Sequence, residues 1–554
     1  MRHILALFLL ISTAVVAQEQ SPHNPVTPGE QGPLTGRWVV SADYYGSLLN
    51  YKLELQQQGT KLTGTFGGDP LEGTLTGNQL QFLAKDPRGG WEDMKATVEG
   101  NTMTGTVVFA ENDDPAHHQT THQFTAKLIP NRRPGPPQHH EFTPTTFSRQ
   151  FSPLNKPVLT IWPSDTVHTT TVDAGGADEK GVTRVLGGNP ETGPFYIETA
   201  APGDTLVVHF TRIRLNRDYA ISDDGLVGRA LNSDTAVKTK DLGADVRWHL
   251  DLQRGVATPE KPGDHLKQYS VPLRPMLGCV ATATGPANAP PPTGDSGGWG
   301  GNMDFNEIVE GSTVYLPVLN PGALLYVGDG HAAQGDGELN GNALETSMDV
   351  EFTVSVIYNK SIFSPRVETP THIITMGLAG SLDEAFRSAT GAMFNWLVEK
   401  YALTPSEIAE VLGTSAEYKV SEVADRNAGM VLMIRKDRLQ SLQPAGKFDD
   451  KQFFGDRAQS MIDQRALEQH LIKKVDAVVP EIARTAQIQG DAVIRVLVDK
   501  QGNVIQTKAI QGHPALVQAA VDAVQQWKYQ PFLLNGEPIA VEGTVVVPFA
   551  SPSK

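Results

Sequence analysis

Residues 323–339 read ALLYVGDGHAAQGDGEL, an apolar run followed directly by a segment crowded with glycine and acidic side chains. The run from Ala323 to Val327 predicts a buried strand, and Gly328 marks its expected end. The side chains beyond that point are Asp329, His331, Gln334, Asp336 and Glu338, spaced by glycines at positions 328, 330, 335 and 337. Glycine lets a loop curl so that several short side chains meet at one point. The stretch therefore predicts a β fold with a polar site at the carboxyl end of a strand.

The residue types in this stretch are those that hold divalent cations. Carboxylate oxygens and a neutral imidazole suit hard and borderline divalent metals. Taken alone, the stretch is equally compatible with a solvated acidic loop. Two further glycine-rich corners carry similar residues, and we expect all three to form one composite site. They are GGWGGNMD, with Asn302 and Asp304, and DTVHTTTVDAGG, with His168 and Asp173.

Length and composition limit the class of protein. The chain has 554 residues, more than one hydrophobic core usually organises, so we expect about two to four domains. Its 53 glycines and 38 prolines favour turn-rich β architecture over helical bundles. A formal net charge of −16 argues against a nucleic-acid partner, because phosphate binding needs concentrated lysine and arginine. The single cysteine, Cys279, excludes an internal disulfide framework, and its small apolar neighbours predict a buried, inert thiol.

Residues 1–17 predict a secretory signal peptide. Arg2 and His3 precede an apolar stretch at residues 4–16, and Val15 and Ala17 form a small-x-small cleavage pattern. The alternative, a membrane anchor, needs about 18 or more apolar residues. No later segment is long and apolar enough to span a bilayer. We therefore expect an exported protein, periplasmic or extracellular after cleavage, whose mature chain has no transmembrane segment.

Residues 33–130 predict a small antiparallel β domain, either a barrel or a sandwich. Polar and apolar residues alternate in YKLELQQQGTKLTGTF, LEGTLTGNQLQFLA and MKATVEGNTMTGTVVF, with glycines between the runs. The opening GRWVV and the repeated LTGT text resemble a lipocalin-type module. The simplest interpretation is an accessory domain without catalysis. Residues 131–141 are rich in proline and predict a linker.

Residues 142–440 consist mainly of predicted strands, with helices only near the end. The run MDVEFTVSVIY alternates almost perfectly between apolar and polar side chains. In SLDEAFRSATGAMFNWLVEKYA the apolar residues follow helical spacing, and Ser381 with Glu384 predicts a capping box at the start. The segment TPSEIAEVLGTSA repeats that signal with Thr404 and Glu407. This region is therefore expected to be β-rich, with two helices towards its end.

Residues 441–477 are charged and predict a helical connector, and residues 478–552 predict a β-β-α-β unit. Two strands meet at Gln501-Gly502, a helix is expected over residues 515–531, and a strand ends the unit. The text GDAVIRVLVDKQGNV followed by HPALVQAAVDAVQQWKYQPFLLNGEP is similar to the C-terminal domain of TonB. The resemblance implies a docking or oligomerisation module. The edge of its sheet is expected to accept a strand from a partner, such as an envelope protein.

The central region resembles the acetamidase/formamidase family. The supporting text runs, in order, through VHTTTVDAGG, NPETGPFYIETAAPGDTLVV, RPMLGCVATA, GGNMD, NPGALLYVGDGHAAQGDGE and HIITMGLAGSLDEAFRSAT. This resemblance covers residues 145–440 and implies a mostly β, sandwich-like fold. It also implies hydrolysis of small linear amides, such as formamide or acetamide, to carboxylate and ammonia with a bound divalent metal. The appended units depart from the family's compact pattern and leave open a different substrate or a loss of activity.

The resemblance implies a ligand set for that metal. His168, Asp173, Asp304 and His331 lie at positions that match the family segments, and they are the expected ligands. The metal is expected to be zinc, with calcium as the alternative. Such a cation lowers the pKa of water towards neutrality, which permits amide hydrolysis without a serine or cysteine nucleophile.

The remaining roles belong to catalysis and substrate binding. Glu338 is the first choice for the acid/base residue, because a second carboxylate near a cation can move a proton from water to the leaving nitrogen. Asp336 is the second choice, and either acid can instead be a ligand. Asn302 is expected to hold the amide group. Trp299 and Gln334 are expected to line the substrate site, although structural packing explains Trp299 equally well.

Two other functions fit the sequence besides an exported amidase. One is a non-catalytic cell-envelope scaffold that docks partners through the TonB-like unit, and the other is an amide- or urea-binding protein for uptake. Release of ammonia from small amides distinguishes the enzyme from both. The sequence does not fix the oligomeric state, and a homo-oligomer is compatible with it.

Overall fold

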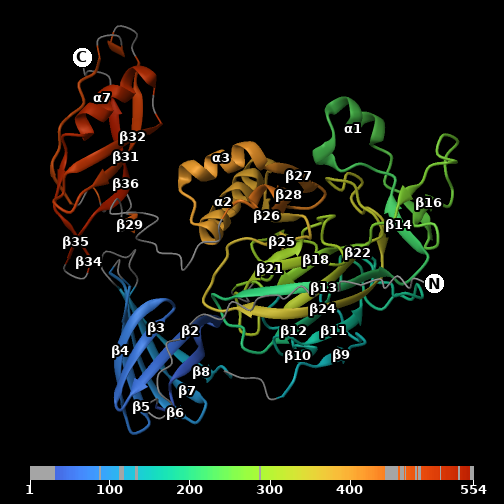
Figure 1. Ribbon diagram of the computed structural model, residues 1–554, viewed down its shortest axis with the longest axis horizontal. Helices are drawn as coiled ribbons and strands as arrows, with labels where there is room; N and C mark the ends of the chain where they lie inside the picture. The colour runs from blue at the N-terminus through green and yellow to red at the C-terminus, as the bar shows by residue number, and fades with distance from the viewer. Residues whose placement is uncertain are drawn as a thin grey trace, which may run out of the picture.

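Figure 1 shows the computed structural model, with a barrel in blue, a large central region and a small C-terminal unit in red. The structure describes residues 32–86, 89–110, 118–130, 135–285, 289–442, 460–461, 467, 470–480, 483–484, 488–511, 513–534 and 537–549. The signal peptide predicted at residues 1–17 lies outside these residues, as does much of the predicted connector. None of the helices in the described ranges combines the length and the hydropathy that a bilayer span requires.

The N-terminal strands form a closed antiparallel barrel, so the barrel alternative is confirmed. Its strands are β1 (Gly36–Tyr44), β2 (Ser47–Gln58), β3 (Lys61–Phe66), β4 (Asp69–Thr76), β5 (Gln79–Lys85), β6 (Trp91–Glu99), β7 (Thr102–Ala110) and β8 (Gln119–Leu128). Each strand pairs with the next, and β8 closes the barrel against β1. The alternating pattern places Trp38, Phe66 and Phe82 in the buried interior. In the repeated TGT text, a Cβ on Gly64 or Gly105 would clash with the neighbouring strand, so glycine permits this close approach.

The central region contains two large sheets and two helices near its end. Its elements are β9 (His139–Glu141), β10 (Leu159–Ile161), β11 (Thr166–Thr170), β12 (Thr192–Ile197), β13 (Thr205–Leu215), β14 (Tyr219–Asp223), η1 (Gly228–Ala230), α1 (Ser233–Thr239), β15 (Asp245–Asp251), β16 (Val256–Pro259), β17 (Val271–Pro272), β18 (Met276–Thr282), β19 (Ser296–Gly297), β20 (Gly300–Asn302), β21 (Thr313–Pro317), β22 (Leu325–His331), β23 (Glu345–Thr346), β24 (Met348–Ile357), β25 (Arg366–Glu368), β26 (His372–Ala379), α2 (Leu382–Tyr401), α3 (Pro405–Ser415), β27 (Glu417–Glu422), β28 (Ala428–Arg435) and η2 (Lys436–Leu439).

The two sheets pack face to face as a sandwich. One, here called the β24 sheet, has the order β27-β28-β26-β25-β21-β13-β24-β11-β9. The other, the β22 sheet, has the order β17-β16-β15-β14-β23-β22-β18-β20-β19, with β12 added at β22 and β10 at β12. Phe195 of the β22 sheet meets Phe352 of the β24 sheet edge to face, with ring centroids 5.4 Å apart. One buried hydrophobic cluster joins both sheets, and this core supports the site described below.

Helices α2 and α3 begin where the sequence predicts. The hydroxyl of Ser381 accepts a hydrogen bond from the Glu384 amide, and Thr404 with Glu407 forms a complete capping box. Helix α2 packs on β26 and β28, where a Cβ on Gly377 would clash with the helix backbone. Figure 1 shows both helices lying over this end of the β24 sheet. The hairpin between β27 and β28 follows these helices and lies close to the β22 sheet. It contributes residues to the site described below.

The C-terminal unit has the expected two strands, helix and final strand. Its elements are β29 (Ser460–Met461), β30 (Leu471–Lys473), β31 (Gly490–Val498), β32 (Val504–Gln511), α7 (Pro514–Val524), β33 (Lys528–Tyr529), β34 (Phe532–Leu534), β35 (Glu537–Ile539) and β36 (Val541–Phe549), and the main sheet has the order β29-β36-β31-β32. The helix predicted over residues 515–531 is too long, because α7 ends at Val524. Trp527 and Tyr529 are instead buried in the core, and the indole of Trp527 donates a hydrogen bond to the Val475 carbonyl.

Candidate metal centre

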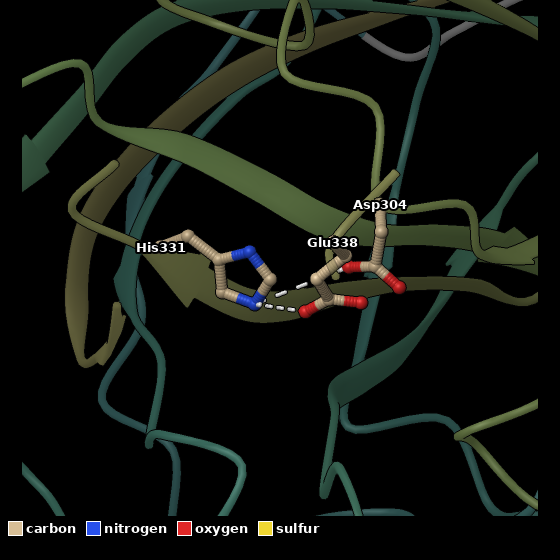
Figure 2. Close-up of side chains that lie close together, drawn as sticks. All are labelled: Asp304, His331 and Glu338. Atoms are coloured by element: carbon tan, nitrogen blue, oxygen red, sulfur yellow. Dashed lines mark ion pairs between the residues drawn. The ribbon is translucent and has the colours of Figure 1, made fainter. Parts of the chain in front are cut away.

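The candidate site is a cluster of buried carboxylates around His331, the last residue of β22. The His331 Nε2 atom lies 3.3 Å from Glu345 Oε1, 3.4 Å from Asp329 Oδ2, 3.9 Å from Asp304 Oδ1 and 4.0 Å from Glu338 Oε1. Figure 2 shows the imidazole edge facing Asp304 and Glu338. The five residues are at most 7% exposed. Within the described part of the chain they form two groups able to hold a metal ion, Asp304–His331–Glu338 and Asp329–His331–Glu345.

The β22 sheet places these side chains. Asp329 and His331 are two residues apart on β22, and Glu345 of β23 is the cross-strand partner of His331. Asp304 follows β20, which pairs with β18. On β18, a Cβ at Gly278 would clash with the carboxylates of both Asp304 and Asp329. The glycine in the RPMLGCVATA text therefore provides the space in which these acids converge.

The donor set fits a divalent cation. Asp304 Oδ1, both Asp329 oxygens, Glu345 Oε2 and His331 Nε2 are buried and find no hydrogen-bond partner among the described residues. Buried charges are stable when they are paired or when they coordinate a metal. Carboxylate oxygens with one imidazole nitrogen are a donor set that zinc accepts. The residues present thus meet the chemical requirements of the predicted metal.

The pKa shifts in the cluster indicate an excess of negative charge. Burial raises the pKa of Asp304 and of Glu338 well above the usual range, and nearby carboxylates add to the effect. Burial likewise raises the pKa of Glu345 to about 8, with help from Asp329. Burial alone would lower the pKa of His331, but the charges of Glu345 and Asp329 raise it well above its usual value. Ionised acids at this density need a cation or bound protons.

One further buried acid, Glu191, lies beside this cluster. Burial and the charge of Asp329 raise the pKa of the fully buried Glu191 well above its usual range. Burial, with the charge of Glu191, similarly raises the pKa of the Cys279 thiol, so Cys279 stays neutral as predicted for an inert residue. Glu191 was not predicted as a site residue. It lies in the NPETGPFYIETA text, where no local pattern distinguishes it from a structural acid.

The hairpin between β27 and β28 completes the site from the helical end of the region. The Asn302 Nδ2 atom donates to Asp304 Oδ2 at 2.7 Å and to Asp425 Oδ2 at 2.8 Å. Burial raises the pKa of Glu422 to about 8 and that of Asp425 to about 6. The Val423 amide donates to the Gly337 carbonyl at 3.0 Å, which ties the hairpin to the segment after β22.

Three predicted residues are brought together, and two of the predicted ligands are not. Asp304, His331 and Glu338 share one cluster. His168 instead lies between Glu141 Oε2 at 2.6 Å and Asp349 Oδ1 at 2.5 Å, and Asp173 forms a 2.7 Å ion pair with the Arg217 guanidinium. The expectation that all four ligands meet was therefore wrong.

Strand parity explains the error for His168. Val167 and Thr169 of β11 face the buried core of the sandwich. His168 between them therefore points away from that core, on the outer face of the β24 sheet. The cluster belongs to the β22 sheet. In the sequence His168 stands in a β-branched run between Val167 and Thr169, and this text does not show which sheet the His168 side chain belongs to.

The other predicted side chains take different places. Asp336, the second choice for catalysis, is 50% exposed and accepts a hydrogen bond from Asn306 rather than joining the cluster. Trp299 lies against Gly297 and beside the buried Cys279 cluster, which is a packing role. Gln334 contacts His331 Nδ1 at 2.8 Å through its side-chain oxygen.

One prediction about the strand itself was also wrong. The strand does not end at Gly328, since β22 continues to His331, so Asp329 and His331 lie on the strand and not in a loop. Neither Gly328 nor Gly330 has a positive φ. A Cβ at Gly328 would clash with the Glu191 carboxylate, and one at Gly330 with Met348. These glycines serve close packing and not a turn.

The fold and the buried cluster define a mostly β protein with a metal-type centre in its central region. Residues 281–395 match the model of the Acetamidase/Formamidase family, and residues 478–550 match the Gram-negative bacterial TonB protein C-terminal model. The central region is thus of the acetamidase/formamidase type, and the C-terminal unit is of the TonB C-terminal type.

Two curated relatives agree with these two matches. A formamidase of Methylophilus methylotrophus is 23% identical over 299 residues, which are 42% of this chain and 72% of that protein. The protein TonB of Vibrio cholerae is 40% identical over 63 residues, so the chain spans only 26% of that relative. Among solved structures, acetamidases from Yersinia enterocolitica and Bacillus halodurans are 26% and 28% identical. Each covers 55% of this chain, with 94% and 99% of its own length and TM-scores of 0.48 and 0.46, respectively.

Proposed function

We propose that the protein hydrolyses the carbon–nitrogen bond of small linear amides to a carboxylate and ammonia. The observation that carries the proposal is the cluster of Asp304, His331, Glu338 and Glu345, all within the segment that matches the Acetamidase/Formamidase model. The formamidase relative supports the choice of formamide as a substrate, and the match to the Acetamidase/Formamidase model supports acetamide beside it.

We also propose that the cluster holds a divalent cation, with zinc as the first choice and calcium as the alternative. A nitrogen donor at His331 favours zinc, because calcium takes oxygen ligands. When bound, such a cation supplies Lewis-acid polarisation of the amide carbonyl and acidification of water. Asp304, Asp329, His331 and Glu345 are the proposed ligands, and they would hold the cation at the end of β22.

Glu338 is the proposed acid/base residue. Its carboxyl is 4% exposed, and burial raises its pKa, so the group holds a proton at neutral pH more readily than an ordinary glutamate. Such a group can accept a proton from water and deliver it to the leaving nitrogen. Asn302 is proposed to make a polar contact with the substrate. Because its Nδ2 atom is engaged by Asp304 and Asp425, its buried Oδ1 atom, which lacks a partner among the described residues, is left to accept a hydrogen bond from the amide N–H of the substrate.

An ammonia-release assay tests the function. The purified protein with zinc should release ammonia from formamide or acetamide and should lose that activity on treatment with a chelator. Glu338→Gln should lower kcat by about 100-fold or more, since it keeps the shape of the side chain but cannot accept the proton. Asp336→Asn is the matched control, because Asp336 lies in the same segment outside the cluster, and it should retain activity.

Two results would contradict the proposal. Absence of ammonia from a panel of small amides in the presence of zinc, manganese or calcium would exclude the enzyme and favour the envelope scaffold. Tight binding of an amide without turnover would favour an uptake protein instead.

We further propose that the protein works in the cell envelope and that its TonB-like unit docks a protein partner. The match of residues 478–550 to the TonB model supports this location. Strand β32 ends the main sheet of the unit and offers an edge for strand addition. Cell fractionation with N-terminal sequencing tests export and cleavage after Ala17, and a chain ending at residue 442 should lose the envelope partner that the full chain retains.

A further inference from the structure

Gln334 makes contacts that fix the orientation of its side-chain amide. It stands three residues after His331, in the segment that follows β22. Its Nε2 atom donates to the backbone carbonyl of Asp304 at 2.5 Å and to that of Ser421 at 3.2 Å. Its Oε1 atom lies 2.8 Å from His331 Nδ1. Both ends of the amide are therefore engaged within the protein.

These contacts determine where His331 carries a proton. The two carbonyl oxygens only accept hydrogen bonds, so the amide nitrogen of Gln334 must face them. The amide oxygen must then face His331, and Nδ1 has to be the donor. In a neutral ring, the proton resides on Nδ1 and the lone pair on Nε2 points at the carboxylates of Asp329 and Glu345.

We propose that Gln334 is a positioning residue that holds His331 in its Nδ1–H form, so that Nε2 is presented to the cation. This inference rests on the proposed cation site. It also gives Gln334 a role different from the substrate contact expected from the sequence. Metal-binding histidines commonly donate their second N–H to a neighbouring acceptor, which fixes both the tautomer and the ring orientation.

The same amide joins three segments that are distant in the sequence. His331 belongs to β22, Asp304 follows β20, and Ser421 belongs to β27. The backbone amide of Gly337 also donates to the Ser421 carbonyl, at 3.2 Å. A purely structural role for Gln334 would therefore also destabilise the fold when removed, and the test has to separate the two effects.

Two substitutions and one control make that separation. Gln334→Met removes both the acceptor for His331 and the donor to the carbonyls. Gln334→Glu keeps an acceptor for Nδ1 but loses the donor. Asn306→Ala is the control, because Asn306 donates to the Gln334 carbonyl at 3.3 Å and to Asp336 at 2.8 Å without contacting His331. Melting temperatures report how much each change weakens the fold.

The readouts are NMR of the histidine ring and zinc affinity. In 15N-histidine-labelled full-length protein, the His331 signals are identified by their absence in His331→Gln. We expect a protonated Nδ1 with a slowly exchanging proton in the parent protein and in Gln334→Glu. That proton should exchange rapidly with solvent in Gln334→Met. Zinc affinity, from competition with a chelating dye, should fall by about 10–100-fold in Gln334→Met, and by much less in Gln334→Glu and Asn306→Ala.

Several outcomes would overturn the inference. A parent protein with an unprotonated Nδ1 on His331 contradicts it directly. Equal losses of affinity in all three variants, in step with their melting temperatures, would assign Gln334 a structural role only. If the parent protein binds no zinc, the proposed cation site fails, whereas the exchange rate of the Nδ1 proton in metal-free parent and Gln334→Met proteins still decides whether Gln334 is its acceptor.

Discussion

Three of the acids around His331 adopt backbone conformations that non-glycine residues rarely take. The φ angle is 40° at Asp304, 52° at Asp329 and 47° at Glu338. Such conformations cost about 1–3 kcal/mol each and persist only where the surrounding contacts enforce them. Together with Glu345, whose backbone is not in this region, these three acids supply the carboxylates that converge on His331 Nε2. The chain therefore tolerates local strain at the positions where converging acids are required.

Gly278 is the residue whose size this convergence depends on. We expect Gly278→Ala to lower zinc affinity strongly, and with it amidase activity, because the new methyl group would occupy the space of the Asp304 and Asp329 carboxylates. Dye competition and ammonia release measure these losses. Gly294→Ala is the control, since a Cβ there meets nothing within 4 Å, and it should leave both properties unchanged. Normal zinc binding by Gly278→Ala would show that the two acids do not share a cation.

Some individual residues of the candidate site could be predicted from the sequence. Asp304, His331 and Glu338 stand in glycine-rich text that carries metal-ligand residue types, and the structure brings these three predicted residues into one cluster. Glu345 and Asp425 were not, because each reaches the cluster through tertiary contacts: one by strand pairing with His331, the other by a hydrogen bond from Asn302. No local pattern encodes such a contact.

At the scale of elements, β9 shows how charged pairs hold a short strand at a sheet edge. All three of its residues have ionisable partners: His139 lies 3.0 Å from Glu351, His140 3.1 Å from Asp165, and Glu141 2.6 Å from His168. Strand β9 forms the last three residues of the predicted linker, which is therefore shorter than expected, and these pairs attach the start of the central region to the β24 sheet. Apolar burial contributes little, because no residue of this strand is fully buried.

The attachment should depend on pH through His168. Desolvation lowers the pKa of His168, but hydrogen bonds to Asp349 and Glu141 outweigh it, and the pKa is raised above its usual value of 6.5. Because both ring nitrogens contact carboxylates, the charged ring is the form that the fold stabilises. Its contribution is fully present below the usual pKa and is lost as pH rises through the raised value.

His168→Gln should therefore lower the melting temperature more at about pH 5.5 than at about pH 8.5. Arg212, which lies 3.2 Å from Asp349, remains as a partner for that acid in the variant. His209→Gln is the control, because His209 is exposed on the same sheet and its Nδ1 atom lies 3.0 Å from a hydroxyl, that of Thr313, and not from a carboxylate. A loss that is equal at both pH values would contradict an ionised His168.

Element boundaries were predictable where a chemical signal marks them. The caps at Ser381 and Thr404 located the starts of α2 and α3 within one residue. The strand end predicted at Gly328 was wrong, because a glycine that permits a turn and one that permits close packing look the same in a sequence. The end of α7 was missed for a related reason: the apolar spacing continues to Trp527, although Trp527 is buried beyond the helix end at Val524.

At the scale of the whole molecule, the barrel is fixed to the central region by a buried charge. Asp204 is fully buried and pairs with Arg37 of β1, and Lys52 of β2 lies 3.6 Å from it. The Arg37 guanidinium also stacks on the Tyr358 ring at 4.5 Å. These contacts join the first two strands of the barrel to the sandwich, so the barrel is not an independent module on a linker.

Arg37→Met tests this connection. It leaves Asp204 with weaker compensation and should lower the free energy of unfolding by about 1–3 kcal/mol, with Lys52 limiting the loss. Proteolysis within residues 131–141 should become faster, because the barrel is released from the sandwich. Chemical denaturation and limited trypsin digestion measure the two effects. Lys61→Met, an exposed barrel change, should alter neither, and equal behaviour of both variants would show that the contact contributes nothing.

The residues of the candidate metal centre come from distant parts of the chain, which affects the order in which the centre is completed during synthesis. Glu191 and Asp425 are 234 residues apart (425 − 191), and both lie at the same cluster. A ribosome extends the chain from its N-terminus, so the barrel and most strands of the sandwich emerge before the β27–β28 hairpin. Until that hairpin arrives, Gln334 lacks the Ser421 carbonyl and Asn302 lacks Asp425. The contacts that surround the proposed cation site are therefore completed late in synthesis, after the strands that carry its proposed ligands have emerged.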